Sequence, residues 1–103
     1  MSKDRDIILL VDDDVEMLKV LQFNLRGEQY KTLATDSAMK AVTIIEENDI
    51  KVIVADDKMP MMCGTKLLET VRRQNPDIVR ILMTGNADSD VAARALNEAD
   101  QYV

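Results

Sequence analysis

Short runs of consecutive apolar residues alternate along this chain with segments in which apolar residues recur every three or four positions. Residues 7–11 and 52–55 are apolar throughout and rich in β-branched side chains, and a similar run at 79–83 is interrupted by Arg80. Continuous apolar runs of this length are typical of strands covered on both faces of a parallel sheet. We therefore expect central strands at these three places.

The segments between these runs have the apolar spacing of helices. The apolar positions are Val15, Leu18, Leu21 and Leu25 in the first segment, Ala38, Ala41, Val42 and Ile45 in the second, and Leu67, Leu68 and Val71 in the third. Asp14 is placed to cap the first helix, and Ser37 or Asp36 to cap the second. Asn75-Pro76 closes the third, and residues 88–97 fit a fourth helix.

Two further segments complete the predicted sheet. Residues 30–35 mix polar and apolar side chains, which suits an edge strand, and residues 101–103 look like the beginning of a fifth strand. Strands alternating with helices and joined by right-handed crossovers give an α/β fold with an open, doubly wound parallel sheet. A chain of 103 residues, 47% of them hydrophobic, is enough for one hydrophobic core. We therefore expect a single domain over residues 1–103.

The amino-acid composition excludes several kinds of partner and of active site. The chain has 13 basic and 19 acidic residues, a net charge of −6, one Phe, two Tyr and no Trp, which does not suit direct contact with nucleic acid. No apolar run approaches the roughly 18 residues of a membrane span, and the charged N-terminus does not resemble a signal peptide. We expect a cytoplasmic protein without a membrane partner. Because the chain has no histidine, an imidazole base and most zinc sites are excluded.

Acidic residues directly follow two of the predicted strands. The polar residues at the strand ends are Asp12, Asp13 and Asp14, then Asp56 and Asp57, then Thr84. Ligands of an open parallel sheet bind beyond the carboxyl ends of its strands, so we expect one shared acidic pocket. At about 4 Å, two carboxylates repel by roughly 4 kcal/mol at an effective dielectric near 20, and a cation would offset this repulsion. Oxygen ligands alone suit Mg²⁺, which commonly bridges to phosphate, so the pocket is a candidate for phosphoryl transfer.

Three segments, in this order, resemble the receiver domains of two-component response regulators. They are Leu9-Leu10-Val11-Asp12-Asp13, then Asp56-Asp57-Lys58-Met59-Pro60 with Gly64 following, and then Ile81-Leu82-Met83-Thr84-Gly85. The resemblance spans nearly the whole chain. It implies a flavodoxin-like, CheY-like (βα)5 fold, of which this chain has an incomplete fifth strand and lacks the last helix.

The resemblance also implies a metal site and a phosphoacceptor. Asp56 would be the carboxylate nucleophile that takes a phosphoryl group from a sensor histidine kinase or a phosphotransfer protein. Asp13 and Asp56 would bind Mg²⁺ directly, Asp12 mainly through water, and Lys58 through its backbone carbonyl.

Two more residues would convert phosphorylation into a signal. Thr84 would hydrogen-bond the acyl phosphate, and Tyr102 stands at the position of the family's switch aromatic. Their movement would change the surface around the fourth helix and the fifth strand. Because a receiver is phosphorylated once per cycle, we expect that this protein is not an enzyme that turns over a pool of substrate.

Departures from the family are also informative. The family has a phosphate-binding lysine two residues beyond the position of Val103, so we interpret the chain as C-terminally truncated. We expect the fourth strand to lose a neighbour, and we expect self-association as a homodimer or an element-swapped oligomer to compensate. The resemblance implies an output domain in the parent protein. By fold-level analogy alone, residues 80–88 are similar to receivers joined to HD-GYP phosphodiesterases.

Two other functions compete with the receiver. A phosphohydrolase of the haloacid-dehalogenase type also has a nucleophilic Asp after its first strand, and Asp12-Asp13-Asp14 fits half of its motif. Glu16 fails the last position, however, and the segment from Asp56 to Pro60 is left unexplained. The second alternative is an interaction module that is not phosphorylated and whose acidic pocket is vestigial.

Overall fold

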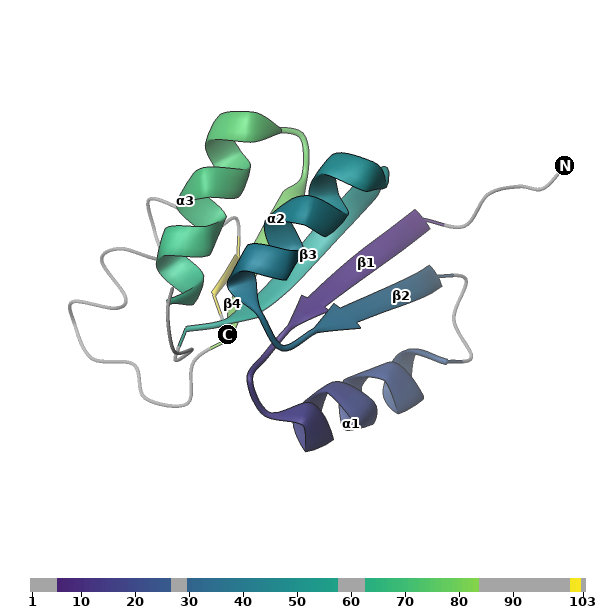
Figure 1. Cartoon of the computed structure of the whole chain (residues 1–103). Helices are drawn as coiled ribbons and strands as arrows, with labels where there is room; N and C mark the ends of the chain where they lie inside the picture. The colour runs from purple at the N-terminus through teal and green to yellow at the C-terminus, as the bar shows by residue number, and fades with distance from the viewer. Residues whose placement is uncertain (1–5, 27–29, 58–62, 84–100, 103) are drawn as a thin grey trace, which may run out of the picture.

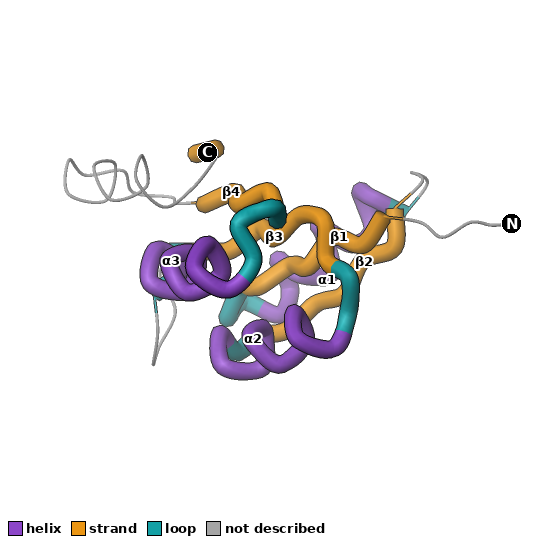
Figure 2. Tube along the Cα trace, turned by 90° about the horizontal axis from the view of Figure 1, so that it is seen from above, coloured by secondary structure: helices purple, strands orange, loops and turns teal. Residues whose placement is uncertain are grey.

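The computed structural model describes residues 6–26, 30–57, 63–83 and 101–102. Its strands are all parallel and form one sheet in the order β2-β1-β3-β4-β5. They are β1 (Asp6–Val11), β2 (Tyr30–Thr35), β3 (Ile50–Asp56), β4 (Val79–Met83) and β5 (Gln101–Tyr102). The described helices are α1 (Val15–Leu25), α2 (Ala38–Glu47) and α3 (Gly64–Gln74). Helix α1 covers one face of the sheet, and α2 and α3 cover the other (Figures 1 and 2).

The central strands are apolar throughout because both of their faces are covered. Along β1, Leu9 and Val11 face the larger core, which includes buried residues of α2 and α3. Ile8 and Leu10 alternate with them and pack with Leu18 of α1 in a smaller core. Successive side chains of a strand point to opposite faces, so a strand between two layers of helices needs apolar residues at every position.

Two of the described helices, α1 and α2, begin directly after residues that the sequence predicted as caps. The Asp14 carboxylate accepts hydrogen bonds from the N–H groups of Glu16 (3.0 Å) and Met17 (3.2 Å) at the start of α1. The Ser37 hydroxyl accepts from Lys40 N–H (3.2 Å), so Ser37 is the side chain that caps α2. Helix α3 begins after Cys63, which makes no capping hydrogen bond through its side chain. Its first turn is instead held by hydrogen bonds from Gly64 and Thr65 to Asp57.

The predicted doubly wound parallel sheet is confirmed, with β2 at one edge. One expectation was partly wrong. Strand β4 does have a neighbour, because β5 pairs with it at Ile81 and Leu82. The predicted helix at 88–97 lies outside the described residues. Among the helices that the structure describes, none is long and apolar enough to cross a membrane.

The charged residue inside β4 is accommodated by hydrogen bonds to the backbone. Arg80 is buried, and its guanidinium donates to the carbonyl oxygens of Pro76 (3.2 Å) and Ile78 (3.0 Å). Charged groups are buried at acceptable cost when they are hydrogen-bonded in this way. The interruption of the apolar pattern at this position is therefore compatible with a strand.

Candidate functional site

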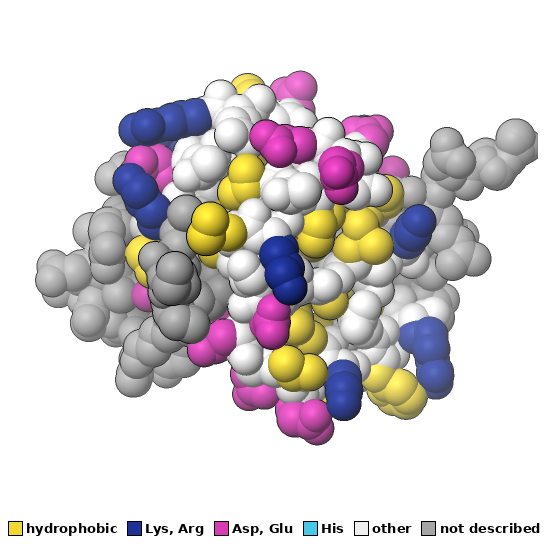
Figure 3. All heavy atoms as spheres, in the orientation of Figure 1, with side chains coloured by type: hydrophobic (Ala, Val, Ile, Leu, Met, Phe, Trp, Pro, Cys, Tyr) yellow, Lys and Arg dark blue, Asp and Glu magenta, His cyan; other side chains and the backbone are white. Residues whose placement is uncertain are grey.

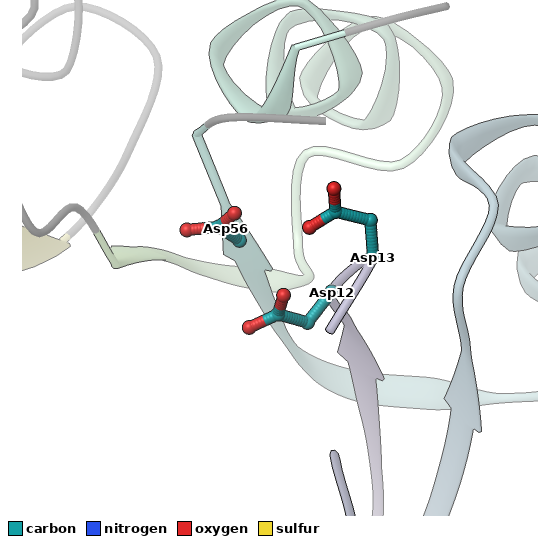
Figure 4. A group of neighbouring side chains, drawn as sticks. All are labelled: Asp12, Asp13 and Asp56. Atoms are coloured by element: carbon teal, nitrogen blue, oxygen red, sulfur yellow. The ribbon is translucent and has the colours of Figure 1, made fainter. Parts of the chain in front are cut away.

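Three carboxylates gather at the carboxyl ends of two neighbouring strands. Strands β1 and β3 are paired in parallel, with Val11 opposite Ala55, so the residues that follow these two lie at the same end of the sheet. Each of Asp12, Asp13 and Asp56 places a carboxylate oxygen within 4.8 Å of those of the other two (Figure 4). The structure thus brings together the three carboxylates that the sequence predicted as metal ligands. We call them the carboxylate cluster.

Asp12 is the most deeply placed member of the cluster, with 6% of its surface exposed. Its Oδ1 accepts a hydrogen bond from Asp14 N–H at 2.9 Å, and its own N–H donates to the Thr35 carbonyl at 3.2 Å. Burial raises the pKa of Asp12 above its usual range, and the charges of Asp13 and Asp14 act in the same direction. The hydrogen bond from Asp14 N–H opposes this rise in pKa only in part. A neighbouring cation is the partner that would favour the charged form of Asp12.

The donor set of the cluster fits a hard divalent cation. Asp13 is exposed and Asp56 is half-buried, so the cluster opens to solvent while Asp12 forms its floor. Mg²⁺ requires oxygen ligands in octahedral geometry and usually keeps several waters. Three carboxylate ligands would leave the remaining positions of such a site to waters or to a phosphate oxygen.

The other predicted site residues are distributed differently. Lys58 and Thr84 lie outside the described residues. Tyr102 belongs to β5, and its backbone pairs with that of Leu82 in β4. Asp14, which we expected to cap a helix rather than bind metal, does cap α1.

Asp57 has a role that the sequence did not reveal. The sequence predicted that Asp57 lies in the acidic pocket, because it follows a strand. In the structure it lies outside the carboxylate cluster, and 6% of its surface is exposed. Its Oδ1 accepts a hydrogen bond from the hydroxyl of Thr65, in the first turn of α3, at 2.9 Å. An Asp eight residues before a Thr is too weak a signal to predict such a contact, because the path of the chain between them is not encoded in the spacing.

Gly64 is required by a close approach of two backbones. A Cβ atom at this position would lie 2.8 Å from the carbonyl carbon of Asp56 and 3.0 Å from the Cα of Asp57. Real Cβ atoms do not approach backbone atoms so closely, so only glycine lets the start of α3 pack against the end of β3. The sequence marked this glycine through its distance from Asp56, but not through this contact.

Comparison with known proteins agrees with this geometry. The family model of the response regulator receiver domain matches residues 8–103. The hydrogenase transcriptional regulatory protein HoxA of Cupriavidus necator is 33% identical over 102 residues, which are 99% of this chain and 21% of HoxA. The transcriptional regulatory protein ZraR of Escherichia coli K12 is 31% identical over 96 residues, which are 93% of this chain and 22% of ZraR. The chain thus spans about a fifth of the length of these relatives.

Solved structures share the fold over nearly the whole chain. The signal receiver domain of an HD domain-containing protein from Pseudomonas fluorescens Pf-5 has a TM-score of 0.93 and 30% identity, and the match covers 100% of this chain and 77% of that one. TrrA from Thermotoga maritima, solved in complex with Mg²⁺ and BeF, has a TM-score of 0.87 and 23% identity, and the match covers 95% of this chain and 84% of TrrA. A CheY-like receiver from Methanospirillum hungatei has a TM-score of 0.92 and 32% identity, and the match covers 97% of this chain and 81% of that receiver. The family model, the relatives and the CheY-like fold together establish that this chain belongs to the response regulator receiver domains of two-component systems.

Proposed function

We propose that this receiver accepts a phosphoryl group on Asp56 in a reaction that requires Mg²⁺ bound at the carboxylate cluster. The observation that carries the proposal is the convergence of Asp12, Asp13 and Asp56 within 4.8 Å at the end of the sheet where ligands of this fold class bind. TrrA, which shares the fold, was solved with Mg²⁺ and BeF. Receiver domains are signalling modules, and we expect one phosphorylation per cycle rather than turnover.

The chemistry follows from the roles of the three carboxylates. Asp56 supplies the nucleophile: a carboxylate oxygen forms the new bond to phosphorus while the bond from phosphorus to the donor's imidazole nitrogen breaks. Asp12 and Asp13 would hold a Mg²⁺ ion, Asp13 directly and Asp12 mainly through water. When bound, the ion would offset the negative charge that the carboxylates and the phosphoryl oxygens bring together.

Three residues outside this cluster complete the proposal. Lys58 would add its backbone carbonyl to the metal ligands, and Thr84 would hydrogen-bond the acyl phosphate. Tyr102 would respond to the movement of Thr84 and change the surface near β5. These roles are carried over from the family by the matching positions of the sequence.

The partners are proposed from the relatives. The donor would be a sensor histidine kinase or a phosphotransfer protein in the cytoplasm. HoxA and ZraR are transcriptional regulatory proteins, which favours an output domain that controls transcription. The Pseudomonas receiver belongs to an HD domain-containing protein, which favours a second type of output. In either case, we propose that phosphorylation of Asp56 controls a separate domain of the parent protein.

Intact-mass spectrometry after incubation with acetyl phosphate or phosphoramidate tests the proposal. We expect one phosphoryl adduct on the wild-type chain in the presence of Mg²⁺, and none with EDTA or on Asp56→Asn. A folded wild-type chain that binds Mg²⁺ but forms no adduct would contradict phosphorylation and favour an interaction module. Steady release of phosphate from a pool of phosphoesters would instead favour the phosphohydrolase.

A further inference from the structure

Asp57, the residue after the proposed phosphoacceptor, is tied to its surroundings by three hydrogen bonds. Its N–H donates to the carbonyl of Met83 at the end of β4 (3.0 Å), and its carbonyl accepts from Gly64 N–H (3.0 Å). Its Oδ1 accepts from the hydroxyl of Thr65 at 2.9 Å. Strands β3 and β4 and helix α3 therefore meet at the residue beside Asp56.

The side-chain hydrogen bond of this group is shielded from water. Asp57 is 6% exposed and Thr65 is 5% exposed. A carboxylate that is buried to this extent is costly unless it is hydrogen-bonded, and a buried hydrogen bond does not compete with solvent. The Thr65 hydroxyl thus has a fixed partner, and the first turn of α3 has a fixed position relative to Asp57.

The start of α3 is held by hydrogen bonds to the backbone and the side chain of Asp57. Its N-cap residue, Cys63, makes no capping hydrogen bond through its side chain, whereas Asp14 and Ser37 cap the other two described helices. The Gly64 N–H donates to the Asp57 carbonyl instead, and the Thr65 hydroxyl adds a second bond, to the Asp57 carboxylate. The helix is thereby anchored to the end of β3.

This anchor bears directly on Asp56. The backbone of Gly64 packs against the Asp56 carbonyl so closely that no side chain fits between them. A shift of the first turn of α3 therefore displaces the backbone that carries the Asp56 carboxylate. Nucleophilic attack is sensitive to such displacement, because about 1 Å of misplacement can cost on the order of 100-fold in rate.

We propose that Thr65 and Asp57 are positioning residues for phosphorylation of Asp56. The inference rests on the proposed function. The Thr65 hydroxyl fixes Asp57 and the start of α3, and these two in turn fix the backbone of Asp56. Neither residue takes part in bond making, and Asp57 is not a member of the carboxylate cluster.

The test compares two substitutions at Thr65 with a matched control. Thr65→Val removes the hydroxyl and keeps the shape, and Thr65→Ser keeps the hydroxyl. Thr70→Val makes the same change elsewhere in α3, where the Thr70 hydroxyl donates to the backbone carbonyl of Lys66 at 3.2 Å. The rate of adduct formation on Asp56 with acetyl phosphate is measured over a range of Mg²⁺ concentrations, at a temperature where circular dichroism shows every variant folded.

We expect Thr65→Val to lower the maximal rate per folded molecule about tenfold or more, and Thr65→Ser to stay within about threefold of the wild type. Thr70→Val is expected to match the wild type. A bond that only stabilised the fold would change the unfolding midpoint without changing the rate per folded molecule. Equal rates for Thr65→Val and Thr70→Val would therefore overturn the inference.

Asp57→Asn decides the question if Thr65→Val does not fold, because asparagine keeps an acceptor oxygen for the Thr65 hydroxyl. We expect its rate to stay within about threefold of the wild type, and a loss of tenfold or more would overturn the inference by showing that the charge, not the hydrogen bond, is required. Failure of the proposed function is distinguishable from failure of the inference. Absence of adduct on the wild type overturns both, whereas adduct formed equally well on wild type and Thr65→Val overturns the inference alone.

Discussion

Asp12 and Asp56 extend from the neighbouring strands β1 and β3 and place carboxylate oxygens within 4.8 Å of each other. In the absence of a cation, this pair brings two negative charges together, and one of them is largely removed from solvent. The two carboxylates repel each other, and a bound cation would offset that repulsion.

Asp12→Asn is expected to stabilise the metal-free protein at neutral pH. The substitution removes a buried charge, and the amide oxygen still accepts the hydrogen bond from Asp14 N–H. We expect a gain of up to about 3 kcal/mol in the free energy of unfolding, the repulsion between two unit charges about 5 Å apart at an effective dielectric near 20. Urea denaturation in EDTA measures it, and the exposed Asp77→Asn is the control. A loss of stability in Asp12→Asn would contradict the electrostatic reasoning.

The same gain is expected to disappear in acid. Because the pKa of Asp12 is raised in the folded state, its ionisation destabilises the protein fully above that folded pKa. The cost fades as pH falls through the folded pKa and is absent below the ordinary pKa of an aspartate. The difference in unfolding free energy between Asp12→Asn and wild type should therefore shrink as pH falls towards 4. If this difference in unfolding free energy grew as pH falls, it would contradict a raised pKa of Asp12 in the folded protein.

Mg²⁺ affinity is expected to fall as pH is lowered, and to begin falling above the ordinary pKa range of aspartate. Protons compete with the metal for the Asp12 carboxylate, whose pKa is raised by its burial. Calorimetric titration with MgCl2 at several pH values measures the affinity. In Asp12→Asn this part of the pH dependence is expected to be missing. An identical pH profile in the two proteins would show that another group controls binding.

Gly64→Ala is expected to lower both stability and phosphorylation. The added Cβ would meet backbone atoms of Asp56 and Asp57, which cannot move aside as a flexible side chain could. Overpacking of this kind costs about 1–3 kcal/mol. Urea denaturation and the acetyl phosphate assay measure the two effects, with Lys66→Ala in the same turn as control. Unchanged stability in Gly64→Ala would show that α3 can move away from β3.

Ser37→Ala is expected to lower the stability of the fold without changing the affinity for Mg²⁺. Loss of the hydrogen bond to Lys40 N–H removes the side-chain cap of α2 and costs about 1 kcal/mol of folding free energy. Because α2 contributes no residue to the carboxylate cluster, Mg²⁺ affinity is expected to stay within about twofold of the wild type. Ser37→Asp, which restores an acceptor at the cap, is expected to recover the stability. Reduced Mg²⁺ affinity in folded Ser37→Ala would reveal coupling across the sheet.

The sequence predicted the parts of the molecule in which one physical requirement dominates. Residues 8–11 are buried on alternating faces of the sheet, and the unbroken apolar run at 7–11 predicted this burial. Asp12, Asp13 and Asp56 could be placed together because the carboxyl ends of neighbouring parallel strands meet at one edge of the sheet. Their residue types then pointed to a hard cation.

Contacts between side chains distant in sequence could not be predicted in this way. The bond between Asp57 and Thr65 depends on how the chain returns from β3 to α3, and no periodicity encodes that path. The carbonyls that accept from Arg80 likewise become apparent only when the turn before β4 is built. Both cases concern polar groups whose burial becomes tolerable only through partners that the fold supplies.

The double coverage of β1 has a consequence for how the site fails on heating. Leu9 and Leu10, three and two residues before Asp12, are almost completely buried on opposite faces of the sheet. Segments with such burial open only in the most global unfolding events, whereas exposed helices and termini open locally. We therefore expect a divalent cation held by Asp12 to be lost in the same event as the cooperative melting of the sheet.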